Sequence, residues 1–446
     1  MLTVLGLGMI LCFMYLIMSR RMTALAALTL IPILFALIAY GLSFYFDSLG
    51  HLEIKQLGEM MLDGVKKLAP TGVMLLFAIL YFAIMIDTGL FDPSVKFILK
   101  LVKGDPLKVV IGTITLTLIV SLDGDGSTTY MICVAAMLPL YKKLGMSPLI
   151  MACLMMLASG IMNLTPWGGP TARAASALHV EASEIFVPMV LPMLAAILWL
   201  YFVGFMYGRM ERKRLGIIEL DVSHGDDIQI SSNPEANRAH LRWFNGLLTV
   251  VLMICLVKGV LPLPILFMIA LCIALVVNYK DVDMQKSLVA HHAGSALNVV
   301  GIIFAAGIFT GILSGTGMVD AMSKELVAII PQSMGPFLAP ITAVISMPLT
   351  FFMSNDAFYY GVLPILSEAA SHYGITPVEM ARASIVGQPV HLLSPLVPST
   401  YLLCGLAGIE FGQHQKFTIK WAILTCLVML VAAMLLGVFP LYSTLH

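Results

Sequence analysis

The chain has 446 residues, of which 59% are hydrophobic and 11% are charged, and its 25 Lys and Arg residues balance 25 Asp and Glu residues. A soluble domain carries roughly 25% charged residues, and a soluble fold of this length could not bury so much apolar surface. Soluble enzymes, nucleic-acid-binding proteins and secreted disulfide-rich scaffolds are therefore excluded. At roughly 20 apolar residues per span, the composition allows about ten to twelve spans. We expect an all-α polytopic membrane protein.

The apolar segments fall into two groups on either side of a polar linker. The first half, 1–208, is predicted to hold apolar segments at 2–18, 22–45, 70–90, 107–140, 148–170 and 184–208. Residues 46–69 are too charged to span, and we expect an amphipathic helix at the membrane interface there. The stretch 209–245 contains RMERKR and SSNPEANR and is predicted to be a solvated linker. The second half, 246–446, is predicted to hold segments at 246–261, 263–279, 291–313, 336–366, 377–400 and 421–440.

Two apolar segments contain polar residues in their middle. Segment 107–140 contains SLDGDGSTT, and segment 336–366 contains Ser354-Asn355-Asp356. Lipid cannot satisfy the backbone of such an interruption, which must be buried in protein or line a cavity. We predict that both segments are re-entrant hairpins. With both treated as hairpins, 18 of the 25 Lys and Arg residues lie in loops on one face, which the positive-inside rule makes cytoplasmic, together with the linker. The protein is expected in the cell membrane.

The two halves share a weak internal repeat. The sequence TGLFD at 88–92 matches TGMVD at 316–320, and LGMSP at 144–148 matches YGITP at 373–377. The two offsets, 228 and 229 residues, are nearly the same. Each half holds about five spans and one hairpin, so an odd number of spans orients the second half upside down. Inverted repeats with interrupted helices in matching positions are typical of secondary transporters, which bind substrate between the repeats.

Two further apolar helices are predicted to be broken, at 148–173 and at 377–400. The first contains NLTPWGGPTAR and the second LLSPLVPST, in which prolines remove backbone donors and a restarted half-helix offers free N–H groups. Such N–H groups suit a carboxylate, and freed carbonyls suit a cation. With the hairpin tips, they predict a site for an organic anion. Its candidate residues are Ser127, Thr128, Asn163, Thr165, Gly168, Gly169, Thr171, Arg173, Ser354, Asn355, Ser394, Ser399 and Thr400.

Three aspartates lie at membrane depth and are candidates for binding a proton or a metal ion. An ionised carboxylate is costly there, so Asp123, Asp125 and Asp356 should be protonated, paired or metal-bound. Their oxygen ligands suit H⁺, Mg²⁺ or Ca²⁺. The alternative is that they only cap the hairpin helices. An intramembrane aspartyl protease is disfavoured because Asp123 and Asp125 are too close in sequence to come from two helices, and no HExxH or GxSxG motif supports another enzyme.

Several other residues have two open interpretations. Arg173 could clamp a carboxylate or anchor its helix at the interface. Asp87 ends an apolar run and is expected to reach toward the interface. His391 is interpreted as a core histidine, although a proton-relay role is open. The role of Trp167 is undecided, while Gly307, Gly311 and Gly315 predict close helix packing.

At these residues the sequence resembles the citrate–metal:proton symporters, the CitMHS family of the ion transporter superfamily. The resemblance covers nearly the whole chain and is carried by FAILYFAIMIDTGLFDP (77–93), KGDPLK (103–108), SLDGDGSTTYM (121–131), NLTPWGGPTARA (163–174) and SNDAFYYG (354–361). Related dicarboxylate carriers build their site from two Ser-Asn-Thr hairpin tips. By position, Asp125, Gly126 and Ser127 would occupy the first tip here, and Ser354, Asn355 and Asp356 the second. Acidic residues replace neutral ones, which disfavours sodium coupling and favours protons.

The resemblance implies uptake of citrate complexed with a divalent cation, of the Mg or Ca type, together with protons. It implies no separate cofactor, a homodimer in the lipid bilayer, and movement of the hairpin-bearing part against a dimeric scaffold. Two alternatives stay open: a proton- or sodium-coupled carrier of free di- or tricarboxylates, and an inorganic-ion exchanger on the same scaffold. No nucleic-acid partner is expected.

Overall fold

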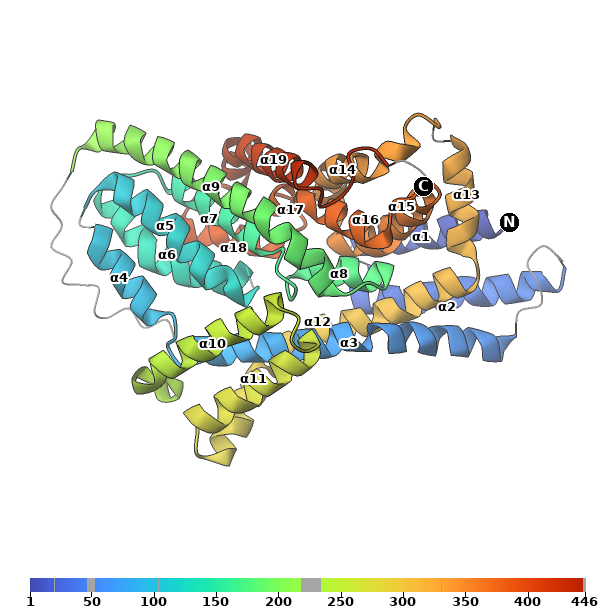
Figure 1. Cartoon of the computed structure of the whole chain (residues 1–446), viewed down its shortest axis with the longest axis horizontal. Coiled ribbons are helices and arrows are strands. Elements are labelled where there is room, and N and C mark those ends of the chain that lie inside the picture. The colour runs from blue at the N-terminus through green and yellow to red at the C-terminus, as the bar shows by residue number, and fades with distance from the viewer. Residues whose placement is uncertain are drawn as a thin grey trace.

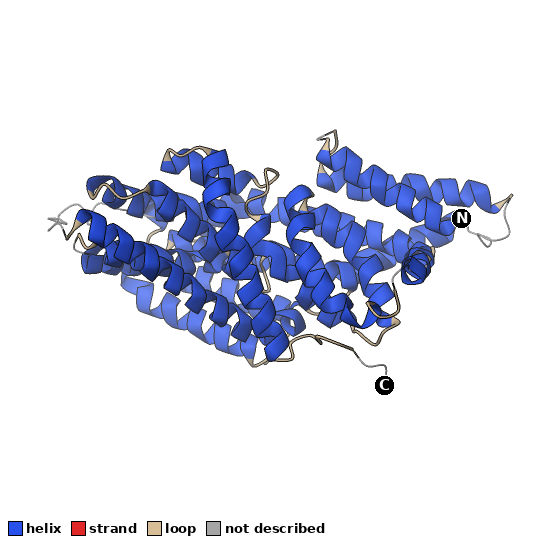
Figure 2. Ribbon diagram, turned by 90° about the horizontal axis from the view of Figure 1, so that it is seen from above, coloured by secondary structure: helices blue, strands red, loops and turns tan. Residues whose placement is uncertain are grey.

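The computed structural model describes residues 1–19, 21–45, 53–102, 104–124, 126–217, 234–329 and 331–443. Within these ranges every regular element is a helix (Figure 2). Seven of the described helices are long and apolar enough to cross a membrane. The prediction of a polytopic all-α membrane protein is therefore confirmed.

The helices of the first half follow the predicted order. They are α1 (Leu2–Met18), α2 (Ala24–Ser43), α3 (Ile54–Asp87), α4 (Asp92–Val102), α5 (Pro106–Val120), the 3₁₀ turn η2 (Ser121–Asp123), α6 (Gly126–Lys143), α7 (Pro148–Met162), α8 (Gly169–Leu178) and α9 (Ala182–Leu215). Helices α5 and α6 pack together as the predicted hairpin. Helices α7 and α8 are the two parts of the predicted broken helix.

The second half repeats this order. After the short turns η4 (Pro234–Ala236) and η5 (Ala239–Leu241) come α10 (Arg242–Val257), α11 (Leu263–Asn278), α12 (Val282–Gly315), α13 (Met318–Ile329), η6 (Gly335–Phe337), α14 (Leu338–Phe352), the π-helix η7 (Ala357–Val362), α15 (Leu363–Ser371), α16 (Pro377–Ser384), η8 (Ile385–Gly387), α17 (Gln388–His391), α18 (Pro398–Ala407) and α19 (Phe411–Leu435). The second hairpin is α14 with η7 and α15, and α16 to α18 form the second broken helix.

Helix boundaries repeat with the offset seen in the sequence. Helices α8 and α18 each have ten residues and begin 229 positions apart, as do α7 and α16. The C-cap residues of α8 and α18, His179 and Gly408, are both left-handed, with φ of 55° and 69°. The repeat therefore extends to backbone conformation. Its exact division at 208 and 246 stays a prediction.

The equivalent helices α3 and α12 run antiparallel along the length of the molecule (Figure 1). Gly64 of α3 faces Gly307 and Gly311 of α12, while Gly72 faces Phe304. The two backbones approach so closely that a methyl group at Gly64 would collide with the carbonyl oxygen of Gly307. The close packing predicted for Gly307 and Gly311 is therefore confirmed. It connects the two halves of the chain through two helices that run in opposite directions.

The prediction of a separate interfacial helix over 46–69 is wrong for the residues that the structure describes. Residues 54–87 form one helix of 34 residues, the same length as α12. Composition alone separates this charged segment from the apolar span, because it contains no information about the partner helix. Its contacts with α12, through Met60 and Gly64, continue the same helix–helix packing beyond the apolar region. Residues 46–52 lie outside the described residues.

A glycine ends each of the two long helices. Gly89 follows α3 with φ of 75°, and Gly317 follows α12 with φ of 73°. The left-handed region is readily accessible to glycine, so the chain can turn sharply into α4 and into α13. These turns connect the long helices to the hairpins. Hairpin α5–α6 and hairpin α14–α15 lie in the two separate ends of the molecule, with the broken helices between them (Figure 1).

We expect Gly64→Ala to destabilise the protein by about 1–3 kcal/mol because the added methyl group meets the α12 backbone. Gly58 lies on the same helix and is exposed, and a methyl group added there would meet nothing within 4 Å. Gly58→Ala should therefore be neutral or stabilise by up to about 1 kcal/mol. Thermal unfolding of both purified variants in detergent measures the difference. Equal effects of the two substitutions would contradict the close crossing.

Candidate functional site

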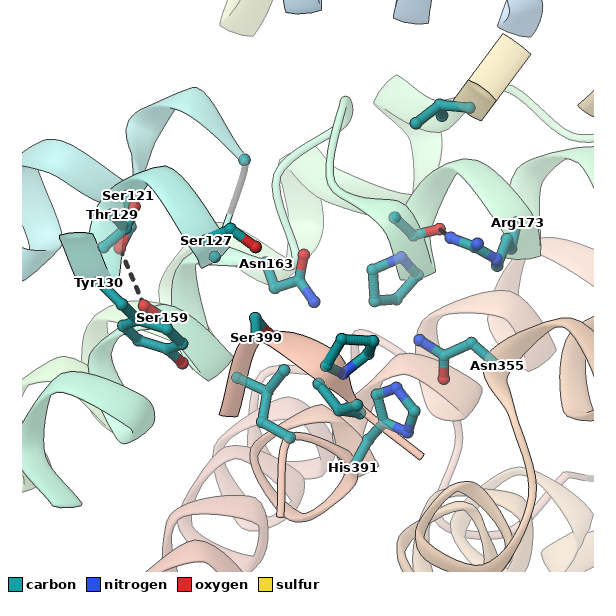
Figure 3. A pocket seen from close by; sticks show the side chains of 18 of the residues that line it. Ser121, Ser127, Thr129, Tyr130, Ser159, Asn163, Arg173, Asn355, His391 and Ser399 are labelled. Atoms are coloured by element: carbon teal, nitrogen blue, oxygen red, sulfur yellow. Dashed lines mark hydrogen bonds between the residues drawn. The ribbon is translucent and has the colours of Figure 1, made fainter. Parts of the chain in front are cut away.

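Both hairpins and both broken helices contribute to one cavity of about 650 Å³. This volume lies within the range of about 300–1,000 Å³ that small-molecule sites occupy. Figure 3 shows residues of the first hairpin and of α7 on one side, with Arg173 and Asn355 on the other and Asn163, Ser399 and His391 between them. The polar interruptions that the sequence places in four separate segments therefore meet.

The first break lies between Met162 of α7 and Gly169 of α8. The Thr171 hydroxyl donates a 2.9 Å hydrogen bond back across the break to the carbonyl of Leu164. The Trp167 indole donates to the carbonyl of Leu122, 2.9 Å away, and thereby ties the break to the first hairpin. The indole ring packs against Phe82 and Phe267, with centroids 5.1 and 5.2 Å apart. Trp167 is therefore a buried residue whose contacts hold the first break against the first hairpin.

The second break is held by the same kind of contact. It separates His391 of α17 from Pro398 of α18. The Thr400 hydroxyl, which is the repeat equivalent of Thr171, donates across the break to the carbonyl of Leu392. Gln415 of α19 donates to the next carbonyl, that of Leu393, at 2.7 Å. The carbonyls of Leu164, Leu392 and Leu393, which the two breaks free from helical pairing, are thus satisfied by side chains.

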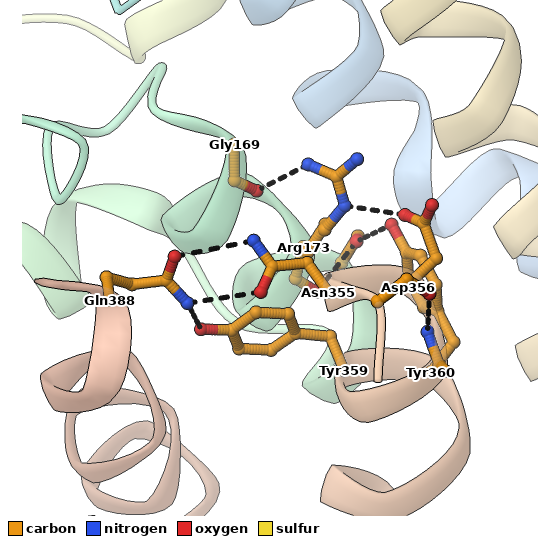
Figure 4. Close-up of polar contacts among 10 residues, drawn as sticks. Gly169, Arg173, Asn355, Asp356, Tyr359, Tyr360 and Gln388 are labelled. Carbon is orange, nitrogen blue, oxygen red and sulfur yellow. Dashed lines mark hydrogen bonds and ion pairs between the residues drawn. The ribbon is translucent and has the colours of Figure 1, made fainter. Parts of the chain in front are cut away.

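An ion pair joins the first broken helix to the second hairpin (Figure 4). Arg173 of α8 donates from Nε to Oδ1 of Asp356 at 2.6 Å, and from Nη1 to the carbonyl of Gly169 at 3.1 Å. Both side chains are mostly buried, with 20% and 13% of their surfaces exposed. A buried charge without a partner is costly, and each of these two side chains reduces that cost for the other. The interpretation of Arg173 as an interfacial anchor is therefore wrong.

Next to this pair, the half-buried amide of Asn355 and the buried amide of Gln388 fix the tip of the second hairpin. Asn355 and Gln388 exchange two hydrogen bonds, of 3.4 and 3.2 Å, and Gln388 also donates to the Tyr359 hydroxyl at 3.0 Å (Figure 4). Tyr359 lies in the π-helix η7, a rare element that is often found at functional sites. The tip thus has a defined orientation toward α17.

The N-termini of three helices contribute to the cavity lining. Gly126 and Ser127 begin α6, Gly169 and Pro170 begin α8, and Pro398 and Ser399 begin α18. A helix N-terminus carries roughly half a positive charge and unpaired N–H groups. Together with the Arg173 guanidinium, these ends make the cavity suited to an anion.

The predicted site residues divide into three groups. Ser127, Asn163, Gly169, Arg173, Asn355 and Ser399 line the cavity. The lining does not include Thr128, Thr165, Gly168, Thr171, Ser354, Ser394, Thr400 or Asp356, although all of these belong to the same four interruptions. The Ser354 hydroxyl accepts from the N–H of Ala357, and Ser394 accepts from Leu396, so both act in local turns. Asp123 lies in η2; its side chain, and all of Asp125, lie outside the described residues.

The other lining residues are not among the predicted binding residues, although the sequence places Gly126 at the first hairpin tip and leaves a proton-relay role open for His391. They are Ser121, Gly124, Gly126, Thr129, Tyr130, Ser159, Pro170, Asn298, Val299, His391, Leu392, Val397 and Pro398. Asn298 could have been found, because it is an amide within the apolar segment 291–313. Ser159 could not, since a serine in an apolar helix satisfies its hydroxyl locally in many structures.

Asp87 is buried, so the expectation that its side chain reaches toward the membrane interface is wrong. Only 1% of its surface is exposed, and its Oδ2 lies 2.6 Å from Nε2 of His292. His292 belongs to α12, so the pair adds a polar contact to the glycine crossing of α3 and α12. The expectation was wrong because the partner of Asp87 lies 205 residues away in the sequence.

Comparisons with known proteins identify the family of this chain and show a similar fold in a solved structure. The model of the CitMHS family, described as citrate transporter, matches residues 7–387. A citrate transporter of Bacillus subtilis is 60% identical, with 98% of this chain and 99% of the relative covered, and a Mg(2+)/citrate complex secondary transporter of the same organism is 52% identical with the same coverage. The YdaH transporter of Alcanivorax borkumensis, a crystal structure of unusual topology, has a similar fold: TM-score 0.59 at 14% identity, covering 93% of this chain and all of that one.

We expect Arg173→Gln and Asp356→Asn each to destabilise the protein by about 3 kcal/mol, because each leaves a mostly buried polar or charged partner behind. The double variant should lose less than the sum of the two, with a coupling of at least about 1 kcal/mol. Thermal unfolding in detergent of the four proteins measures this cycle. Lys286→Gln, which breaks an exposed pair with Asp283, is the control and should have little effect. Strictly additive losses would mean that the Arg173–Asp356 contact contributes nothing.

Proposed function

Because this chain belongs to the CitMHS citrate transporter family, we propose that it takes up citrate as a complex with a divalent cation, in symport with protons. It is a multi-pass membrane transporter and not an enzyme. The observation that carries the proposal is the meeting of three helix N-termini and Arg173 at one cavity. This arrangement recognises carboxylate groups by N–H donors, helix dipoles and a guanidinium.

Charge arithmetic supports a metal complex over free citrate. Free citrate carries three negative charges near neutral pH, whereas its complex with one divalent cation carries a single one. Removing a multiply charged anion from water is far more costly than removing a singly charged one. The described charges at the site, Arg173 and Asp356, cancel each other, so a weakly charged ligand is the one that the cavity accommodates best.

Within this proposal the predicted residues have three different roles: contact with the ligand, binding of the proton or metal ion, and support of the two breaks. Asn163, Asn355, Ser127 and Ser399 offer hydroxyl and amide groups to the ligand, and Arg173 offers its remaining N–H groups. Asp123, Asp125 and Asp356 remain the candidates for the proton or the metal ion. Thr171 and Thr400 support the site indirectly, since their hydroxyls hold the two breaks in shape.

The resemblance also leads us to propose a homodimer in which the hairpins and broken helices move against a scaffold. The tightly crossed α3 and α12, with α2 and α11 packed on them, form the natural candidate for that scaffold. The turns at Gly89 and Gly317 connect it to the moving part. We also propose that the linker 209–245 lies on the cytoplasmic side of the membrane.

Purified protein in proteoliposomes is expected to take up labelled citrate when Mg²⁺ or Ca²⁺ is present, and an inward proton gradient should stimulate the uptake. Excess chelator should stop citrate uptake, because it removes the divalent cation and leaves citrate as the free trivalent anion. Empty liposomes under the same conditions are the control. Unchanged uptake in chelator would favour a carrier of free di- or tricarboxylates. Absence of citrate accumulation under every ionic condition would favour an inorganic-ion exchanger.

Asp125→Asn and Asp356→Asn are each expected to abolish citrate uptake while the protein still inserts in the membrane. Insertion depends on the apolar spans, which neither substitution alters. Uptake per amount of inserted protein is the measurement, with Asp283→Asn as a control because Asp283 is exposed and is not among the described residues that line the cavity. Wild-type uptake by either variant would remove that residue from the site.

A further inference from the structure

His391 lies at the end of α17, immediately before the second break, and lines the cavity. Only 7% of its surface is exposed. Its Nδ1 atom lies 2.6 Å from the carbonyl oxygen of Thr350 in α14. A carbonyl oxygen can only accept a hydrogen bond, so Nδ1 carries a proton in both the neutral and the charged ring. The neutral ring therefore has its lone pair on Nε2.

Among the residues that the structure describes, the hydrogen bond of the His391 ring is the one between Nδ1 and Thr350. Because Nδ1 is tied to the protein, Nε2 is the polar atom that the ring can present to the cavity (Figure 3). The position of the ring is fixed by the Thr350 contact and by α17, which packs between α7, α14 and α19. The lone pair is thus held in place before any ligand binds.

The titratable side chains among the described lining residues are Tyr130, Arg173 and His391. A tyrosine hydroxyl is neutral near pH 7 and an arginine stays charged, whereas histidine is the side chain that changes charge between about pH 5 and 8. Arg173, which also lines the cavity, is paired with Asp356. The helices packed against α17 carry Cys153 on α7, and His414, Lys416, Lys420 and Cys426 on α19, while α14 carries no titratable side chain.

We propose that Nε2 of His391, in place of the carboxyl groups of Asp123, Asp125 and Asp356, binds the proton that is transported with the ligand, an inference that rests on the proposed citrate symport. A proton from the outer solution binds to the Nε2 lone pair, and the resulting imidazolium donates a hydrogen bond to a carboxylate oxygen of the anionic complex. Each charge stabilises the other, so proton and ligand bind cooperatively. By reciprocity, the departure of either one on the inner side promotes release of the other. The proton leaves Nε2 for the inner solution with the ligand.

A metal ion is the other species that could bind an imidazole nitrogen. Mg²⁺ and Ca²⁺ prefer oxygen ligands, which citrate itself and the hydroxyls and amides of the cavity supply. His391 is therefore better suited to the proton than to the cation. Direct coordination would appear as a change in metal preference when His391 is replaced, and this separates the two roles.

The test compares two transport modes of the purified protein in proteoliposomes, with labelled citrate and Mg²⁺. Counterflow exchanges internal for external citrate without a pH gradient, whereas net accumulation uses an imposed inward proton gradient. In His391→Gln the amide replaces Nε2 but cannot be protonated. Loss of the charged donor should weaken citrate binding in both modes, but gradient-driven accumulation should fall at least about tenfold more than counterflow, and uptake should lose the pH dependence that the wild type shows.

Two further variants keep the test decisive. His391→Asn retains an N–H near the position of Nδ1 for Thr350 and serves if the Gln variant does not fold. His372→Gln, an exposed histidine, should behave like wild type in both modes. Normal accumulation by the His391 variants, parallel loss of both modes, or a changed metal preference would each overturn the assignment. Failure of wild-type protein to accumulate citrate would instead overturn the proposed function.

Discussion

An interrupted helix inside an apolar protein leaves backbone groups that lipid cannot satisfy, and the architecture follows from how that problem is solved. Four interruptions lie in four separate segments, and all contribute to one cavity. Freed carbonyls at the two breaks are satisfied by Thr171, Thr400 and Gln415. The helix N-termini contribute to the cavity, where their dipoles favour an anion. The binding site is thus a consequence of gathering these breaks together.

The Arg173–Asp356 pair gives that cavity its charge balance and connects the two halves. Arg173 comes from the first broken helix and Asp356 from the second hairpin, 183 residues apart. Because the pair is mostly buried, its geometry must be maintained by its neighbours, and the amide contacts of Asn355 and Gln388 provide this on one side. A ligand carboxylate that approaches Arg173 competes with Asp356, so ligand binding and the position of the hairpin tip are physically linked.

The long helices provide a different kind of contact. Helices α3 and α12 meet through Gly64, Gly307 and Gly311 at backbone distance, and the buried Asp87–His292 pair adds a polar contact. Such packing leaves little room for sliding, which suits a rigid support. At Gly160 and Pro389, which are repeat equivalents, α7 and α17 also touch, with 2.9 Å between a Cβ placed on Gly160 and the Pro389 Cα. The two halves therefore also contact each other through the two broken helices.

The helical membrane class, the two hairpins, the two breaks and the repeat register could all be predicted from the amino-acid sequence, because hydropathy and the backbone effects of proline and glycine act locally. The same local patterns identified Arg173, Asn163, Asn355 and Ser399 as polar residues in those breaks. Four features required the three-dimensional arrangement: the Arg173–Asp356 pair, the burial of Asp87 against His292, the continuation of α3 through its charged segment, and the contact between Nδ1 of His391 and Thr350. The three side-chain contacts join residues from 41 to 205 positions apart, and the course of α3 depends on α12, so no local pattern encodes them.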